Sequence, residues 1–239
     1  MNVNLSKRLK AAYDMVSEGS VVADIGCDHA FLSIALVSSG KVLSAFACDV
    51  NKGPLGKASK NIEAAGFSEK IHTVLSDGLI SLNEPVDSIV ICGMGGSLII
   101  SILNNSLEKV NAARELILSP QSDTAKVRIW LRDHNFSLVK ETAVTDAGKY
   151  YCVMRVVPSD KPSGWEVPEI PDEAFYYVMK YGPYLITHPD RVFKEHLLKK
   201  EKEIRKILAQ LDRLNPRYKE LDEELKWVII FMRDKFETK

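Results

Sequence analysis

The sequence is poor in cysteine and has no long hydrophobic run. Its four cysteines are widely spaced and form no C-x-x-C pair, so we expect neither a disulfide bond nor a zinc or redox site. No apolar stretch approaches the ~20 residues that a membrane-spanning helix needs, and the basic N-terminus is not followed by the apolar core of a signal peptide. These absences predict a cytoplasmic protein that binds no metal and no membrane.

The sequence also lacks an excess of charge of either sign, because 32 basic residues balance 32 acidic ones. No global electrostatic field therefore attracts nucleic acid. The local exception is the segment 191–206, which has seven basic residues against three acidic ones. This excess indicates a stripe that faces phosphates, with Lys199, Lys202 and Lys206 as candidates; the alternative is a solvent-exposed helix face with i,i+4 ion pairs.

One segment resembles the strand-turn-helix with which a nucleotide-binding site begins, but it lacks the dinucleotide-binding motif G-x-G-x-x-G. The β-branched run 21–25 followed by Gly26 predicts a buried parallel strand that turns tightly into a helix. The later glycine positions of that motif hold Asp28 and Phe31, so a pyrophosphate would meet a carboxylate. An acid here suits a ligand with a positive end, such as the amino group of S-adenosylmethionine; the alternative is an ordinary strand-to-helix turn.

Three further apolar runs end in polar or glycine-rich tips. The first ends at Asp49, 25 residues after Asp24, which is near the spacing at which nucleotide-binding α/β folds place a carboxylate on ribose hydroxyls. The second ends at Asp77, where a carboxylate can accept from an adenine amino group, and the third ends in Gly93-Met94-Gly95-Gly96. Ligands of open parallel sheets bind outside the carboxyl ends of the strands, so these tips predict one shared site. Its expected cofactor-binding residues are Asp24, Gly26, Cys27, His29, Asp49, Val50, Asn51, Asp77, Gly78, Gly93, Met94 and Gly95.

Strand and helix patterns alternate along the first 157 residues. We expect strands at 21–25, 42–50, 71–78, 86–92, 115–119, 137–145 and 150–157, and helices at about 5–17, 29–39, 53–66, 96–109 and 123–134. The last two strands are joined by a connection of hairpin length, so they pair antiparallel. The pattern predicts a doubly wound α/β fold with a Rossmann-like, seven-stranded sheet, the layout of class I methyltransferases.

A second domain follows a proline-rich linker. Four prolines and a glycine between 158 and 171 mark the boundary, which divides the chain into domains 1–160 and 161–239. Beyond it, apolar residues at three-four spacing run from Phe193 to Leu214, stop at Asn215-Pro216 and resume up to Met232. This spacing predicts a small helical hairpin with coiled-coil character.

Four segments resemble those of one family. Asp24-Ile25-Gly26-Cys27-Asp28-His29-Ala30, Gly93-Met94-Gly95-Gly96, Ser119-Pro120-Gln121 and the segment 146–151 are similar to those of the TrmK family of bacterial tRNA (adenine-N1)-methyltransferases. The resemblance extends over nearly the whole chain, although Cys27 and the short linker depart from the family's pattern. It implies methyl transfer from S-adenosylmethionine to N1 of adenine 22 in the tRNA D-loop, and a C-terminal domain that holds tRNA.

The chemistry of this reaction requires positioning more than base catalysis, because adenine N1 is a neutral nucleophile. The fourth strand is not followed by the [Asp/Asn]-Pro-Pro-aromatic motif of enzymes that methylate N6, so N1 is the favoured target. Asp28 is the candidate catalytic residue, since it can stabilise the cationic product; the alternative is that it binds the cofactor's amino group. The target base must leave its stack to enter a pocket. The candidate substrate-binding residues of the first domain are Arg8, Phe31, Gln121, Lys149, Tyr150 and Tyr151.

Other functions and simpler roles remain open at this point. A nicotinamide-dependent oxidoreductase is disfavoured, because the sequence has neither G-x-G-x-x-G nor a convincing Tyr-x-x-x-Lys pair. A catalytically silent module that binds tRNA or protein would share the fold, and a small-molecule methyltransferase is disfavoured by the basic hairpin. His29 has a simpler interpretation as a helix cap, and Arg8 as a solvent-exposed helix residue. A monomer is the expected oligomeric state.

Overall fold

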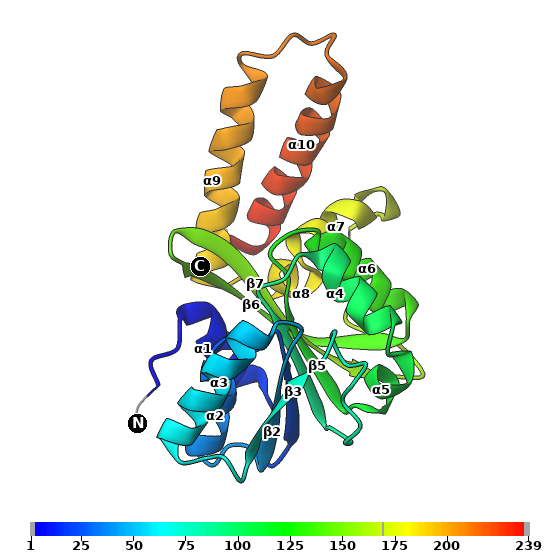
Figure 1. The fold of residues 1–239 in the computed structure, drawn as a ribbon. Coiled ribbons are helices and arrows are strands. Elements are labelled where there is room, and N and C mark those ends of the chain that lie inside the picture. Colours follow the sequence, from blue (N-terminus) through cyan, green and yellow to red (C-terminus); the bar gives the residue numbers. More distant parts are fainter. Residues whose placement is uncertain (1–2, 169, 237–239) are drawn as a thin grey trace. The chain divides into compact units, whose positions relative to one another are not determined.

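The computed structural model describes residues 3–168 and 170–236, and the chain divides into two compact units, Met1–Ser163 and Gly164–Lys239 (Figure 1). The first unit contains a seven-stranded sheet of order β3-β2-β1-β4-β5-β7-β6. Strands β1 to β5 are parallel, and β6 pairs antiparallel with β7, as predicted. Strand β7 also pairs antiparallel with β5, which was not predicted. The strands are β1 (Val21–Ile25), β2 (Ser44–Asp49), β3 (Ile71–Leu75), β4 (Ser88–Cys92), β5 (Glu115–Ser119), β6 (Phe136–Asp146) and β7 (Lys149–Pro158).

Helices cover both faces of this sheet (Figure 1). On one face, α1 contacts β5, β6 and β7, and α2 lies between α1 and α3; on the other face, α4 packs against α6. The central strands β4 and β5 are buried along nearly their whole length, which explains why they are continuous apolar runs in the sequence. The helices are α1 (Lys7–Met15), α2 (Phe31–Ser38), α3 (Lys52–Ala65), α4 (Gly96–Asn104), α5 (Leu107–Ala112) and α6 (Thr124–Asp133).

The single helix expected at 96–109 was a wrong prediction. Helix α4 ends at Asn104, and α5 begins at Leu107 after Ser106, whose backbone is not helical (φ −144°, ψ 37°). Asparagine and serine compete with helical hydrogen bonding through their own side chains, so a break at Asn105-Ser106 is inexpensive. The apolar spacing continues across the break because both helices bury one side.

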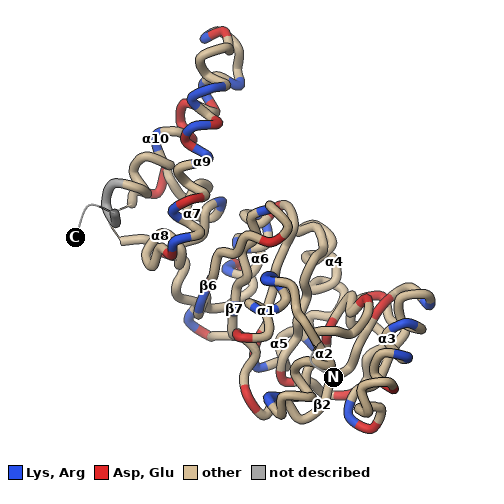
Figure 2. Tube along the Cα trace, turned by 90° about the vertical axis from the view of Figure 1, so that its left-hand side faces the viewer, with Lys and Arg blue, Asp and Glu red and all other residues tan. Residues whose placement is uncertain are grey.

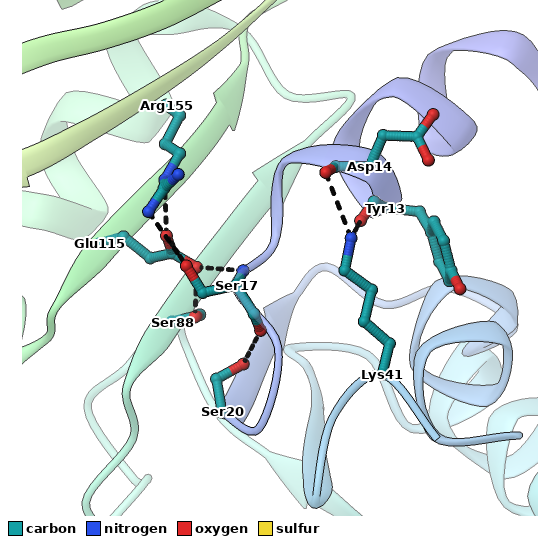
Figure 3. Close-up of polar contacts among 8 residues, drawn as sticks. All are labelled: Tyr13, Asp14, Ser17, Ser20, Lys41, Ser88, Glu115 and Arg155. Atoms are coloured by element: carbon teal, nitrogen blue, oxygen red, sulfur yellow. Dashed lines mark hydrogen bonds and ion pairs between the residues drawn. The ribbon is translucent and has the colours of Figure 1, made fainter. Parts of the chain in front are cut away.

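A buried carboxylate joins four segments at the amino ends of the central strands (Figure 3). The side chain of Glu115 accepts hydrogen bonds from the backbone N–H of Ser17 at 2.8 Å, from its hydroxyl at 2.8 Å, and from the hydroxyl of Ser88 at 2.7 Å. Its other partner is Arg155, whose Nε lies 2.7 Å from Oε2. Nearby, Lys41 donates to the backbone carbonyl of Tyr13 at 2.7 Å. These contacts connect the end of α1 to strands β4, β5 and β7. They lie at the opposite end of the sheet from the carboxyl ends of the parallel strands.

A second buried ion pair joins α6 to the edge of the sheet. Arg128 on α6 and Glu141 on β6 lie 2.7 Å apart, and their side chains are only 1% and 0% exposed. Arg128 also donates to the Sγ of Cys152 on β7 at 3.3 Å. Burying two charges costs much of what their attraction returns, so the pair sets how these elements align more than it adds net stability.

The regular structure in the described part of the second unit is helical. The predicted hairpin is present as α9 (Arg191–Leu208) and α10 (Pro216–Phe236), which pack against each other through residues such as Leu197 and Val228. Two short helices and a 3-10 turn were not predicted. They are η1 (Asp172–Ala174), α7 (Phe175–Tyr181) and α8 (Pro183–Thr187). In the described part of the chain, no helix combines the length and the apolar character that crossing a membrane requires.

The apolar repeat of the first hairpin helix was predicted too long. Helix α9 ends at Leu208, and Leu214 lies in the connection with 91% of its surface exposed. The side chain of Asp212 accepts the backbone N–H of Leu214 at 2.8 Å, and that of Asn215 accepts the N–H of Arg217 at 3.0 Å. These local bonds stabilise turns in place of another helical turn.

We predict that Glu141→Ala lowers the free energy of unfolding by about 3–5 kcal/mol, because it leaves the buried guanidinium of Arg128 without its counter-charge. Chemical denaturation measures the change. The matched control is the double variant Arg128→Met/Glu141→Leu, which removes both charges and should retain most of the stability. A single variant that is as stable as the double variant would contradict the prediction.

Candidate active site

The crevice at the carboxyl ends of β1 and β4 is the point where the strand order reverses. From β1 the chain continues into α2 on one face of the sheet, and from β4 into α4 on the other, so the two connections diverge. Two cavities open here, with volumes of about 390 Å³ and 210 Å³. Both are lined by Gly26, Asp28, Cys92 and Gly93, so they form adjoining halves of one site.

The larger cavity lies above the ends of β2 and β3. The side chain of Asp49 is nearly buried, and its Oδ1 accepts the backbone N–H of Asn51 at 2.8 Å, which fixes the carboxylate in place. Asp77 is exposed at the rim, and Leu98 and Ile102 of α4 supply an apolar wall. Two acceptors beside an apolar surface fit a ligand with a flat apolar ring and hydroxyl or amino donors. The other predicted residues that line this cavity are Val50, Gly78 and Met94.

Two glycines allow the strand tips to approach each other closely. Gly26 has φ +71°, and a Cβ at this position would lie 2.2 Å from the Cε of Met94. Gly93 has φ +84°, and a Cβ there would lie 3.0 Å from the guanidinium of Arg8. The positive φ disfavours any other residue at both positions, and a side chain there would also displace the end of Met94 or of Arg8. The neighbouring loop also carries strain, because Asp28 adopts a left-handed conformation with φ +50°.

The smaller cavity brings opposite charges together. Burial raises the pKa of Asp24 to about 6, although the hydroxyl of Ser33 donates to its Oδ2 at 2.7 Å and favours the ionised form. Arg8 from α1 lines the same cavity and is half-buried, so its interpretation as a solvent-exposed residue is wrong. Within the described residues, Arg8 Nε is buried without a hydrogen-bond partner. A carboxylate and a guanidinium in one cavity fit a ligand end that carries both charges.

Aromatic and titratable side chains surround this smaller cavity. His29 stacks on Phe31 with ring centroids 5.4 Å apart, and its Nε2 lies 3.5 Å from the Oδ1 of Asp28. Phe31 is 43% exposed and therefore presents an open ring face. Cys27 is buried, and burial raises the pKa of its thiol, so its side chain is a packing element and not a nucleophile.

The β6–β7 hairpin brings one of its two adjacent tyrosines to the site. The guanidinium of Arg8 lies 5.0 Å from the ring centre of Tyr151, and the backbone N–H of Arg8 donates to the side chain of Asp146 at 3.3 Å. Successive residues of a strand point to opposite faces, so Tyr150 points away from Arg8. Lys149 is exposed where the hairpin begins its second strand.

The remaining predicted residues line neither cavity. The backbone N–H of Gln121 donates to the carbonyl of Met94 at 2.8 Å, so its exposed side chain borders the glycine-rich tip. Gly95 follows that tip but lines neither cavity. Lys199, Lys202 and Lys206 belong to the second unit. Among the described residues, no group of three or more potential metal ligands is close enough to hold an ion.

Several residues of the site were not predicted. Ser33 was missed although it is a buried polar residue within the apolar run of α2, which is a detectable signal. Leu98 and Ile102 carry no such signal, because apolar residues at helical spacing indicate a core face in general. Only the fold turns them toward the cavity.

Comparison with known proteins gives consistent matches. The family model described as a methyltransferase domain matches residues 5–154. A tRNA (adenine(22)-N(1))-methyltransferase of Bacillus subtilis is 31% identical over 192 residues, which is 80% of this chain and 79% of that protein. The crystal structure of a putative tRNA (m1A22) methyltransferase of Streptococcus pneumoniae is 33% identical, with a TM-score of 0.85, and covers 96% of this chain and 100% of that one. Its complex with S-adenosyl-L-methionine is 32% identical, with a TM-score of 0.82 and the same coverage.

Proposed function

The chain belongs to the TrmK family of tRNA (adenine(22)-N(1))-methyltransferases, and we propose on this premise that it transfers the methyl group of S-adenosylmethionine to N1 of adenine 22 in tRNA. The family predicted from the four sequence segments is confirmed. The observation that carries the proposal for this chain is the two-part crevice, whose acidic, basic and apolar walls match the different parts of that cofactor.

The larger half of the crevice suits the adenosine of the cofactor. Asp49, held by the N–H of Asn51, would accept hydrogen bonds from the ribose hydroxyls, and Asp77 would accept from the adenine amino group. The side chains of Leu98 and Ile102 would pack against the base. A buried carboxylate and an apolar wall thus divide the recognition of sugar and base.

The smaller half suits the methionine end. Asp24 is a buried carboxylate that gains a counter-charge if an ammonium group binds beside it. Arg8 has a buried donor without a partner among the described residues, and a carboxylate would satisfy it. The two unlike charges of the cavity therefore match the α-amino and α-carboxylate groups of the cofactor.

Catalysis in this site rests on orientation. When bound, S-adenosylmethionine supplies an electrophilic methyl group, and adenine N1 needs no base to attack it. Phe31, supported by the ring of His29, offers a surface on which an extruded base can stack. Asp28 lines both halves of the crevice, so its carboxylate would stabilise the positive charge that the adenine acquires.

The substrate, location and assembly of the protein follow from the same proposal. Family membership and an intact cofactor crevice favour an active tRNA-modifying enzyme over a silent binding module or a small-molecule methyltransferase. A tRNA substrate supports a cytoplasmic location. We propose a monomer that works without a metal ion, with unit Met1–Ser163 as the catalytic domain and unit Gly164–Lys239 as a domain that holds tRNA.

The basic stripe of the hairpin contains both paired and unpaired charges. Figure 2 shows basic and acidic residues interspersed along α9 and α10. Lys199 lies 3.9 Å from Glu203, and Arg205 lies 2.8 Å from Glu201, as expected for a solvent-exposed face. Lys202 and Lys206 are exposed and form no ion pair with a described residue. These two lysines are the better candidates for phosphate contacts.

The reaction itself is tested by the identity of its product. Bulk tRNA incubated with the protein and labelled S-adenosylmethionine should yield 1-methyladenosine, detected by nucleoside mass spectrometry, and replacement of adenine 22 should abolish it. Asp49→Ala should weaken cofactor binding by about 1–3 kcal/mol and reduce the label accordingly. Label found only in N6-methyladenosine, in protein or in a small metabolite would contradict the proposal.

Cofactor affinity should depend on pH through Asp24. The carboxylate is ionised above its pKa of about 6 and attracts an ammonium, but below that pH a proton must leave before the pair forms. The dissociation constant should therefore rise as the pH falls from 7.5 to 5, with a slope approaching about tenfold per pH unit. Calorimetry across this range measures it. Asp24→Asn should bind more weakly at pH 7.5 and show a flatter profile; an equally steep profile would assign the dependence to another group.

Charge reversal tests the hairpin. Replacing Lys199, Lys202 and Lys206 by Glu should weaken tRNA binding and reduce its salt dependence, because phosphate contacts release counterions, while cofactor affinity stays the same. Filter binding at several salt concentrations measures both effects. If the triple variant binds tRNA as the intact chain does, the stripe is only a solvent-exposed helix face and does not contact tRNA.

A further inference from the structure

A groove outside the cofactor crevice runs between α1 and one face of the β6–β7 hairpin. Its volume is about 570 Å³, and it lies wholly within the first unit. Lys7 and Lys10 border it on the helix, and Lys140 and Arg155 border it on the strands. Because β6 is the edge strand of the sheet, the groove is not closed by a further strand on that side.

The pairing of β6 with β7 places the strand residues of the groove on one face of the sheet. Lys140 lies directly opposite Arg155 in the antiparallel pairing of β6 and β7, so their side chains share a face. Val144 and Tyr151 form another such pair nearer to the hairpin tip, where the ring of Tyr151 meets the guanidinium of Arg8. The groove and the smaller half of the crevice therefore share helix α1, and Arg8 of the crevice contacts the hairpin through Tyr151.

Most charged side chains that border the groove form ion pairs, and two of its lysines do not. Lys10 forms an ion pair with Asp14, and Arg155 forms one with the buried Glu115. The ammonium groups of Lys7 and Lys140 are exposed and form no ion pair with a described residue. The groove therefore has two available positive charges.

One acidic residue, Asp146, lies near the Lys7 end of the groove, and its carboxylate already interacts with neighbouring groups. The pKa of Asp146 is lowered mainly by the hydroxyl of Ser6, and further by the backbone N–H of Arg8 and the charges of Arg8 and Lys7. Asp146 therefore stabilises the start of α1 against the hairpin tip. The acids at the Lys140 end of the groove are engaged as well, since Asp14 pairs with Lys10 and Glu115 pairs with Arg155.

We propose that this groove, defined by Lys7 and Lys140, binds the sugar-phosphate backbone of the tRNA next to the target adenine. The inference rests on the proposed function, since it assigns a path to the RNA that the crevice modifies. A base that is extruded toward Phe31 keeps its flanking phosphates close to the crevice, and the groove begins beside Arg8. Ammonium groups that contact phosphates position the RNA without reading its sequence.

The test is a double charge reversal, Lys7→Glu/Lys140→Glu, with Lys60→Glu/Lys70→Glu as the matched control. Both control lysines are exposed and lie on or just after α3, away from the groove, and they change the net charge by the same amount. We expect the groove variant to bind tRNA about tenfold more weakly at physiological salt, with a salt slope reduced by about two. Its KM for tRNA should rise, whereas its affinity for S-adenosylmethionine should equal that of the intact chain. The control variant should match the intact chain in all four measurements.

Each outcome decides between this groove and its alternatives. Equal tRNA affinity and salt slope in the groove and control variants would overturn the proposal, and so would a loss of methyl transfer with unchanged tRNA affinity. An equal loss in both variants would overturn it too, because the effect would then be one of net charge. If the intact chain binds tRNA through the groove but forms no 1-methyladenosine, the groove stands and the proposed function fails.

Discussion

The parallel pairing of β1 with β2 on one side and β4 on the other is the constraint on which the site depends. In this register Asp24 lies beside Ala47 of β2 and Val90 of β4, so the three strands end at one level. Their connections then leave on opposite faces, and no backbone closes the gap between them. Gly26 and Gly93 keep the gap narrow enough for both halves of the crevice to adjoin. A shift of one strand by one residue would turn Asp24 to the other face of the sheet.

The network at the opposite edge maintains this register. Glu115 holds Ser17, Ser88 and Arg155 by hydrogen bonds and an ion pair of 2.7–2.8 Å, so the amino ends of β4 and β5 and the carboxyl-terminal half of the antiparallel β7 cannot slide independently. Unlike the charges of the crevice, these charges are satisfied within the protein. The fold thus places an ion-paired network at one end of the parallel strands, where it gives alignment, and the crevice at the other end, where it is available for a ligand.

The crevice contains a buried carboxylate and a buried guanidinium N–H whose interactions a ligand would complete. Burial raises the pKa of Asp24 to about 6, so its ionised form is disfavoured, and Arg8 keeps a buried donor without a hydrogen-bond partner among the described residues. A zwitterionic ligand supplies both missing groups at once. By contrast, several charges on the groove and hairpin are paired at the surface, whereas Lys7, Lys140, Lys202 and Lys206 form no ion pair with a described residue. A chain with no net charge can thereby bind a polyanion through local features.

The sequence by itself determined the strands, their parallel order and the acidic and glycine-rich tips. These features are written in short-range patterns of burial and turn formation, which is why Asp24, Asp49 and the tip at Gly93 were predicted. The tertiary structure alone decided which residues from other elements reach those tips. Arg8 enters the site because α1 packs on the β6–β7 face, Tyr151 faces it while Tyr150 does not, and Leu214 is exposed because Asp212 turns the chain. Such outcomes depend on contacts between residues far apart in the chain or on competing local hydrogen bonds. Neither of these produces a periodic pattern of residues in the sequence.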